Sequence, residues 1–384
     1  MKNFIPDIRA GILYSLMITA SLLSSCHSHA PDKSNSDFRP DSLFAPEYAQ
    51  LFRTGYSGSF PAAHIMDPWD SGKILSRLAL VPRGISLQSI PKGYSPVYVP
   101  LRSVATTSST LISHLSDLGC LKVLTGVSDT AFIFNSFVRK RIEKGLVTEI
   151  ATGEKIHFEA LIENDPDAAV FSLFPGQDNS RLQEVGIEMI PFADYLEQDP
   201  LARAEWIRFT GWLLGKDRLA DSLFRITAQR YNTLRKLADS AGTRLRIFDG
   251  WMTGGVWYIS GGRSYMARFY QDAGLLYVFS GLPESGSKAS GFEEVYSKAS
   301  DAEVWRLIVS DRKGFSRKDI LVSDSRYALF KAFRDGKILV CNASLTPYYE
   351  EGVARPDRIL SDLIHGVYPG LLPGYQPYYY QTLP

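Results

Sequence analysis

The sequence has few of the residues that usually carry metal or redox chemistry. Its 384 residues include only three cysteines and six histidines. Four of the histidines, His64, His114, His157 and His365, stand isolated along the chain. This distribution argues against binding of bare Zn²⁺ or Mn²⁺ through several histidines and carboxylates.

Catalytic signatures are missing as well. The chain contains no Gly-x-Ser-x-Gly, no His-Glu-x-x-His and no Walker-type phosphate loop. A Ser/His/Asp triad assembled from distant residues remains an alternative at this stage. These absences argue against those classes of enzyme, and an extracytoplasmic hydrolase or an adhesive surface lipoprotein stays an alternative function.

Charge of one sign is not in excess. The 42 lysines and arginines against 41 aspartates and glutamates leave a net charge of +1, which gives no electrostatic case for a nucleic-acid partner. The chain is 45% hydrophobic and 22% charged, a composition typical of a folded globular protein. Aromatic residues make up 12% and suit a large, flat or apolar ligand. We expect a monomer.

The hydrophobic segment near the start of the chain is short. Lys2 and Arg9 precede the apolar run Ala10–Leu23, which falls below the ~20 residues that span a bilayer. Positive charge, a short apolar run and small residues predict a secretory signal peptide over residues 1–25. The alternative is a transmembrane anchor.

The end of this segment, Leu23-Ser24-Ser25-Cys26, resembles the lipobox of bacterial lipoproteins. That resemblance implies a lipid on Cys26 and an extracytoplasmic, membrane-anchored protein in the periplasm or at the cell surface. Cys120 and Cys341 remain. An oxidising compartment would allow them to pair, but each lies beside a short apolar segment, which favours two buried thiols over a disulfide.

The rest of the chain divides by composition and periodicity. Residues 26–40 are rich in Ser, Asp, Lys and Pro and predict a flexible tether. Alternating segments predict a β-rich N-terminal extension over 41–97. Strands alternate with helices over 98–215 and again over 241–384, which predicts two α/β lobes with mostly parallel sheets. Between them, 216–240 predicts one long bridging helix with a single buried face.

Individual elements follow from the same periodicities. The predicted strands are Ser103–Ala105, Lys122–Gly126, Ala168–Phe171, Ile187–Ile190, Arg244–Phe248, Arg306–Val309 and Lys337–Val340. The predicted helices are Thr110–Leu118, His157–Ile162, Lys216–Ser240, Tyr265–Ala273, Asp324–Arg334 and Arg358–Val367.

Several stretches, in the correct order, resemble the substrate-binding lipoproteins of ABC importers for iron complexes and cobalamin. They are Phe158-Glu159-Ala160-Leu161 before Asp165-Pro166-Asp167, Arg203 to Phe209, Gly261-Gly262 with Ser264-Tyr265, Asp272-Ala273-Gly274, and Arg355 to Leu363. The resemblance covers about residues 98–384. It implies two Rossmann-like α/β lobes joined by one long helix, with the ligand in a cleft between them.

The resemblance also implies a ligand and a partner. The ligand would be a small metal complex, namely a ferric siderophore, haem or a corrinoid, and no resident cofactor or metal ion is implied. The partner would be a membrane permease with its ATPase. The cobalamin-binding member carries a tryptophan where this chain has Gly153, so that motif does not support cobalamin, and a ferric siderophore is slightly favoured.

Ligands of open α/β sheets bind beyond the carboxyl ends of the strands. In the first lobe this rule selects Thr107, Ser108, Ser109, Phe174 and Tyr195. In the second lobe it selects Trp251, Trp257, Tyr258, Arg263, Arg312, Tyr348 and Tyr349. The aromatic residues could stack on a ligand, and the arginines could pair with an anionic chelate. The alternative is that most of these aromatics belong to the core.

The family docks on its permease through one carboxylate on each lobe. Glu159 and Glu293 occupy the matching places, and Glu294 is the adjacent candidate. The alternative is that they are solvated glutamates that the helix dipole stabilises.

Overall fold

The computed structural model describes residues 42–57, 60–85, 90, 92–174, 186–335 and 337–384. The predicted signal peptide, the lipidated Cys26 and the tether lie outside the described residues. Within the described part, no helix is both long and apolar enough to cross a membrane.

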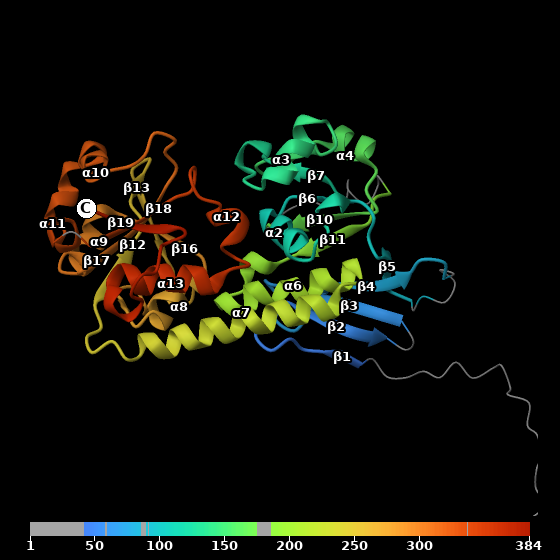
Figure 1. The fold of residues 1–384 in the computed structure, drawn as a ribbon, viewed down its shortest axis with the longest axis horizontal. Helices are drawn as coiled ribbons and strands as arrows, with labels where there is room; N and C mark the ends of the chain where they lie inside the picture. Colours follow the sequence, from blue (N-terminus) through green and yellow to red (C-terminus); the bar gives the residue numbers. More distant parts are fainter. Residues whose placement is uncertain (1–41, 58–59, 86–89, 91, 175–185, 336) are drawn as a thin grey trace, which may run out of the picture. The chain divides into compact units, whose positions relative to one another are not determined.

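An open five-stranded sheet precedes the α/β part of the chain (Figure 1). Its strands, in spatial order, are β1 (Ser42–Phe44), β2 (Phe52–Ser57), β3 (Phe60–Met66), β4 (Ile74–Pro82) and β5 (Ser95–Val99). The first four pair antiparallel, and β5 joins β4 in parallel.

Two buried carboxylates attach the start of this sheet to the helical part of the chain. Glu205 accepts the backbone N–H groups of residues 47–49 at 2.7–2.9 Å. Glu197 accepts those of residues 50 and 51 at 2.9–3.1 Å. Phe52 then packs edge-on against Trp206 with ring centroids 5.0 Å apart. Because buried carboxylates need hydrogen-bond partners, these contacts hold the extension against the following helix.

The first lobe is built on a six-stranded sheet in which five strands run parallel. In spatial order these are β11 (Met189–Phe192), β10 (Ala168–Ser172), β6 (Val104–Thr106), β7 (Leu124–Ser128), β8 (Thr148–Thr152) and the antiparallel β9 (Lys155–Ile156). Its helices are α2 (Ser109–Asp117), α3 (Ser136–Glu143) and α4 (Phe158–Asn164). The four predicted strands are present, whereas α3, β8 and β9 were not predicted.

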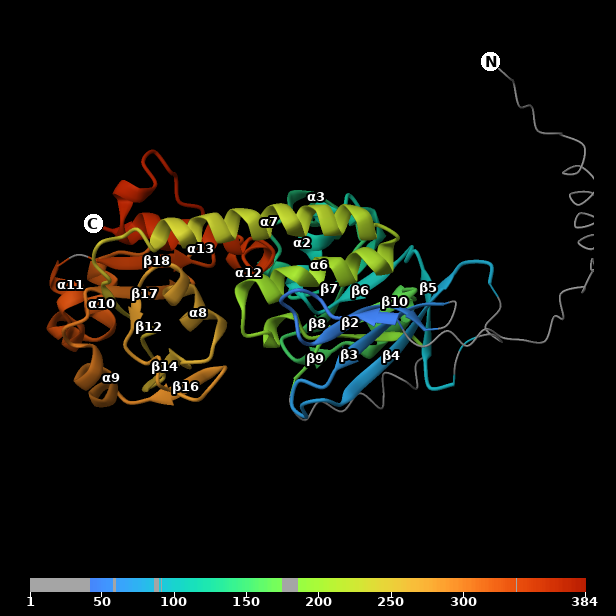
Figure 2. The ribbon, with the colours of Figure 1, turned by 90° about the horizontal axis from the view of Figure 1, so that it is seen from below.

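Two consecutive helices connect the lobes (Figure 2). The first, α6, spans Pro200–Leu214, and the second, α7, spans Asp217–Ala238. Gly215 ends α6 with a φ of 62°, a left-handed conformation that glycine adopts without steric cost. The 22 residues of α7 give it a length of ~33 Å, and it packs on α6 and on α13 (Pro356–Val367). The predicted bridging helix is therefore present, and α6 is an additional partner for it.

The second lobe has a five-stranded sheet and a smaller three-stranded one. The larger contains β15 (Leu276–Tyr277), β12 (Arg246–Asp249), β17 (Val304–Val309), β18 (Ile338–Asn342) and the antiparallel β19 (Tyr380–Leu383). The smaller contains β13 (Met252–Thr253), β14 (Val256–Ser260) and β16 (Ser287–Ser290). The helices are α8 (Tyr265–Asp272), α9 (Phe292–Ala299), α10 (Arg317–Ser323), α11 (Lys331–Asp335), α12 (Tyr348–Glu351) and α13.

The predicted single helix Asp324–Arg334 is wrong. A 3₁₀ turn over Ser325–Leu329 precedes α11, and the two are separated by Phe330, whose backbone is extended. Phe330 is fully buried, and its ring stacks on Phe248 with centroids 5.0 Å apart. Burying this ring in the aromatic core outweighs the small gain from continuing a helix through it.

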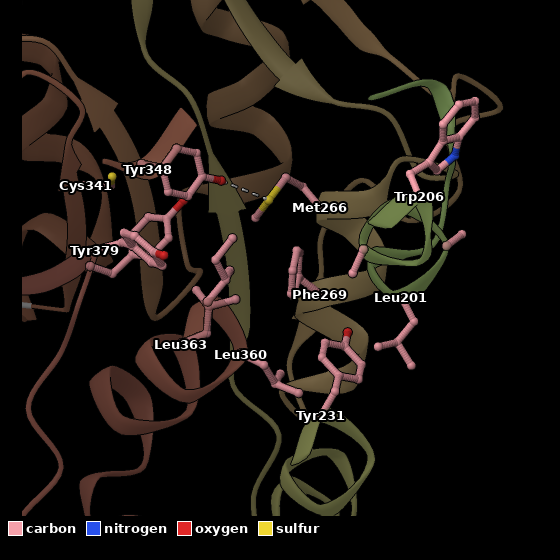
Figure 3. Close-up of a cluster of buried hydrophobic side chains, with 14 of the residues drawn as sticks. Leu201, Trp206, Tyr231, Met266, Phe269, Cys341, Tyr348, Leu360, Leu363 and Tyr379 are labelled. Atoms are coloured by element: carbon pink, nitrogen blue, oxygen red, sulfur yellow. Dashed lines mark hydrogen bonds between the residues drawn. The ribbon is translucent and has the colours of Figure 1, made fainter. Parts of the chain in front are cut away.

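The hydrophobic core continues from the helices into the second lobe, as Figure 3 shows for side chains of α6, α7, α8 and α13. Tyr231 of α7 donates a hydrogen bond to Asp272 at 2.8 Å, which ties the bridging helix to the second lobe. Both remaining cysteines are unpaired thiols: Cys341 is buried in β18, and Cys120 is half-buried.

Candidate functional site

A cavity of about 410 Å³, here called the interlobe cavity, is lined by residues of both lobes and of α6. Six aromatic side chains line it: Phe174 and Tyr195 from the first lobe, and Tyr265, Phe269, Tyr348 and Tyr349 from the second. Its size and aromatic lining are typical of a small-molecule site.

The polar side of the cavity comes from the segment that follows β6. Thr107, Ser108 and Ser109 all line the interlobe cavity, as the position beyond the carboxyl end of a parallel strand predicts. Ser108 is the N-cap residue of α2, and its backbone N–H donates to the Thr106 hydroxyl at 2.9 Å. The N-terminus of α2 therefore faces the cavity with its positive dipole end.

Arg203 is the one cationic side chain among the described residues that line the interlobe cavity, and it was not selected from the sequence. It lies in the first turn of α6, and its guanidinium carbon stands 3.5 Å from the centre of the Tyr265 ring. Its Nε donates to the Glu197 carbonyl at 2.9 Å, and another guanidinium nitrogen donates to the Tyr195 carbonyl. A cation held in this way over an aromatic face can pair with an anionic ligand.

Asp194 lies beside Arg203 and is 2% exposed. Burial raises the pKa of its carboxyl to about 6, and the Thr110 hydroxyl and the Arg203 charge oppose that shift. Its Oδ2 has no hydrogen-bond partner among the described residues. Near neutral pH the described lining of the cavity therefore contains one cation and one acid that is easily protonated.

Two buried or half-buried tyrosines of the cavity, Tyr195 and Tyr348, are neutral phenols. Burial raises the pKa of Tyr195 and Tyr348 above its ordinary value. The hydroxyl of Tyr348 donates to the sulfur of Met266 at 3.8 Å (Figure 3). The described residues around the cavity include no histidine, cysteine or methionine. The lining thus offers apolar contact and hydrogen bonds, and few strong metal ligands.

Three residues selected from the sequence lie elsewhere in the second lobe. Trp257 is fully buried, and its indole N–H donates to the Asp249 carbonyl at 2.9 Å. Its neighbour Tyr258 points to the opposite side of β14 and is 53% exposed, because side chains alternate along a strand. Trp251 packs edge-on against Phe315. None of the three lines the interlobe cavity.

Neither arginine selected from the sequence lines the cavity. Arg263 is exposed and lies on a separate groove beside Arg268. Arg312 is exposed in the loop after β17. Arg203 could have been noticed from its place in the stretch Arg203 to Phe209, but only the tertiary fold puts it under the aromatic side chains.

The four histidines in the described part of the chain do not gather into a site. The His64 ring contacts the Tyr94 hydroxyl at 2.7 Å, and the buried His114 contacts the Thr210 hydroxyl at 3.0 Å. The described part of the chain has no group of three or more His, Cys, Asp or Glu residues placed to hold a metal ion.

Glu159 and Glu293 occupy equivalent places in the two lobes. Glu159 lies in the first turn of α4, and Glu293 lies in the first turn of α9. The strand after each helix pairs in parallel with the first strand of its lobe: β10 pairs with β6 in the first lobe, and β17 pairs with β12 in the second. Both side chains are exposed. The side chain of Glu293 is 85% exposed, and its carboxylate lies 3.5 Å from the guanidinium of Arg326. Glu294 instead pairs with Lys288 at 2.5 Å.

Comparison with known proteins gives similarities at the levels of sequence and fold. An uncharacterised lipoprotein of Methanocaldococcus jannaschii is 24% identical over 309 residues, which are 76% of this chain and 71% of the relative. A second lipoprotein of that organism is 23% identical over 330 residues, 82% and 83% of the two chains.

Solved structures share the fold. A periplasmic haem-binding protein from Pseudomonas aeruginosa matches with a TM-score of 0.58 and 17% identity, over 74% of this chain and 98% of the other. An ABC-type Fe³⁺-hydroxamate transport protein from Saccharomonospora viridis matches with a TM-score of 0.54 and 19% identity, over 69% and 92%. The family described as periplasmic binding protein matches residues 104–345, more than half of the chain. This chain therefore belongs to the periplasmic binding protein family.

Proposed function

We propose that this chain is the lipid-anchored substrate-binding protein of an ABC importer, and that it captures an anionic iron complex between its lobes. The observation that carries the proposal is the interlobe cavity, whose described lining places six aromatic side chains around one cation, Arg203. Apolar contact would hold the body of such a ligand, and the guanidinium would pair with its negative charge.

The donor set favours an iron complex whose coordination sphere is already full. Haem iron usually takes an axial ligand from His, Met, Cys or Tyr. Among the described lining residues only tyrosines could serve, and burial raises the pKa of Tyr195 and Tyr348, which disfavours their phenolate forms. We therefore propose a ferric siderophore ahead of haem, with a corrinoid as the third candidate. The names of the structural neighbours, which mention haem and Fe³⁺-hydroxamate, agree with this range.

Delivery would use the membrane and a permease. The two archaeal relatives are lipoproteins, which supports lipidation at Cys26 and an extracytoplasmic location. The exposed Glu159 and Glu293, at equivalent places in the lobes, would meet cationic residues of the permease. Such charge pairs mainly orient the partners and raise their encounter rate.

Thermal unfolding with candidate ligands tests this function. A ferric trihydroxamate, a ferric catecholate, haemin and cobalamin would each be added to the purified protein. A ligand present at about 100 times its Kd stabilises the fold by about 2.7 kcal/mol. We expect the largest shift with a ferric siderophore, and no shift with any of the four would contradict the proposal.

Arg203→Met supplies the matched comparison. Loss of a charge-assisted contact in the cavity should weaken binding of the anionic complex by about tenfold or more. Arg312→Met removes the same charge from an exposed loop outside the cavity and should leave the affinity unchanged. Equal effects of the two substitutions would exclude the pairing role of Arg203.

A further inference from the structure

The short helix α12 connects the second lobe directly to the first. Glu350 of α12 is only 4% exposed, and its Oε2 accepts the backbone N–H groups of Phe134 and Asn135 at 2.7 and 3.3 Å. One residue earlier, the carbonyl of Tyr349 accepts the hydroxyl of Ser109 at 3.0 Å. Figure 1 shows α12 reaching from the second lobe toward α2. Three hydrogen bonds therefore join a helix of four residues to the opposite lobe.

This helix also divides the space between the lobes. A second cavity of about 240 Å³, here called the Phe132 cavity, is lined by Phe132, Ile133 and Glu350 among others. Thr107, Ser109 and Tyr349 line both this cavity and the interlobe cavity. Tyr349 is 58% exposed, so its ring is not fixed in the core. The two cavities are thus neighbours that share a wall, and Tyr349 forms part of it.

Two opposing effects determine how strongly Glu350 attaches α12 to the first lobe. Burial of the Glu350 carboxylate is unfavourable, as the raised pKa of this group shows, and the two backbone N–H groups offset the cost. A second link between the lobes, the ion pair of Asp117 with Arg355, lies at the other end of α2 and does not involve α12. Release of α12 would therefore leave the lobes joined at that end.

We propose that α12 is a clasp, and that its release merges the interlobe cavity and the Phe132 cavity into one site for a ligand too large for either. The hydrogen bonds of Glu350 and Ser109 hold the clasp closed, and Tyr349 closes the passage between the two cavities. This inference goes beyond the proposed function, because it concerns how the cleft opens and holds for any ligand.

Hydrogen exchange of the ligand-free protein tests the clasp. Glu350→Ala and the milder Glu350→Gln should accelerate exchange of the amides of Phe134 and Asn135, and also of the segment around Thr107 and Ser109, by about tenfold or more. Glu351→Gln is the matched control, since Glu351 lies on the same helix but pairs with Arg358 of its own lobe at 3.2 Å. It should leave exchange at both segments unchanged.

Ser109→Ala gives an independent variant that leaves Glu350 in place. It should also accelerate exchange of α12, and small-angle scattering should show a larger radius of gyration for Glu350→Ala than for Glu351→Gln. Faster exchange limited to the amides of Phe134 and Asn135, together with an unchanged radius of gyration, would overturn the clasp. It would show that α12 is fixed in place without its hydrogen bonds from Glu350.

Binding kinetics then separate the clasp from the proposed function. With a ferric trihydroxamate as the probe, Glu350→Ala should raise both the association and the dissociation rate about tenfold or more. Unchanged rates in a variant that exchanges faster would overturn the role of the clasp in ligand entry. If no ligand binds, the proposed function fails, while the exchange and scattering results still decide the clasp.

Discussion

At the scale of single residues, His114 shows how burial sets the charge of a side chain. It is fully buried between α2 and α6, and desolvation lowers the pKa of its imidazole to about 4. Its Nε2 has no hydrogen-bond partner among the described residues. The folded protein therefore keeps His114 neutral under conditions in which the unfolded chain would protonate it.

This predicts a loss of stability in mild acid. Between pH 6.5 and about 4 the unfolded chain binds a proton at His114 that the folded chain does not, so the free energy of unfolding falls as the pH falls through this window. The full shift corresponds to about 3 kcal/mol. Asp194 has the opposite sign, because its raised pKa makes the folded state bind the proton more tightly up to about pH 6.

The two effects are separated by comparing the protein with His114→Asn. Urea unfolding at pH 7.5 and 4.5 should show a smaller loss of stability in the variant, since asparagine can keep the contact with Thr210 but does not titrate. Identical pH profiles would show that His114 does not contribute to the acid sensitivity.

At the scale of elements, the close packing of α6 on α7 depends on a glycine. A Cβ added at Gly211 would lie 2.5 Å from the Cβ of Ala220 and 3.2 Å from the backbone of Asp217. We expect Gly211→Ala to destabilise the protein by about 1–3 kcal/mol, because a well-packed helix pair cannot absorb an extra methyl group. Urea unfolding measures the effect.

Gly366→Ala in α13 is the control for this prediction. There the added Cβ would also lie 2.5 Å from a neighbour, but that neighbour is the end of the Leu339 side chain, which can rotate away. The gain in helix propensity, about 1 kcal/mol, offsets part of the cost. A loss as large as that of Gly211→Ala would show that packing against backbone is not the decisive difference.

At the scale of the whole molecule, the two glutamates of the proposed docking surface must act together. Reversing both charges in Glu159→Lys/Glu293→Lys should abolish most ligand uptake in cells while the purified protein keeps its affinity, because both side chains lie outside the interlobe cavity. Glu163→Lys, also exposed on α4, should transport normally. Normal uptake by the double variant would contradict the docking role.

The elements that were predicted correctly are those with a strong local signal. Leucines and isoleucines at three- and four-residue steps predict the helix α7, and the helix is present. Its buried face is wrongly predicted, because Ala220, Phe224, Ala228, Tyr231 and Ala238 form it while Leu219 and Ile226 are 42% and 44% exposed. The 324–334 segment has a helical pattern too, but Phe330 is drawn into the aromatic core and interrupts it. Local periodicity cannot reveal such a competition, since the rings that surround Phe330 come from α9 and from the distant strands β12, β14 and β17.

The candidate site was predicted in part for the same reason. Thr107, Ser108 and Ser109 follow a parallel strand, so topology alone places them at the cavity. Trp257 also belongs to a strand, yet its side chain points into the core. Because successive side chains of a strand point to opposite faces, a shift of one residue decides whether a side chain lies in the core or at the surface. Arg203 lies in a helix, where no local rule separates a ligand-facing arginine from a solvated one.

The sequence by itself determined the bridging helix, most of the parallel strands, the two α/β lobes and the resemblance to the family, because periodicity and short motifs are local properties of the chain. Only the tertiary structure decided that Arg203 lies at the interlobe cavity in place of Arg263 or Arg312, and that Glu350 reaches the backbone of the opposite lobe. These contacts join residues from 8 to 216 positions apart in the chain. Their energies depend on burial and distance, which arise only when the lobes pack together.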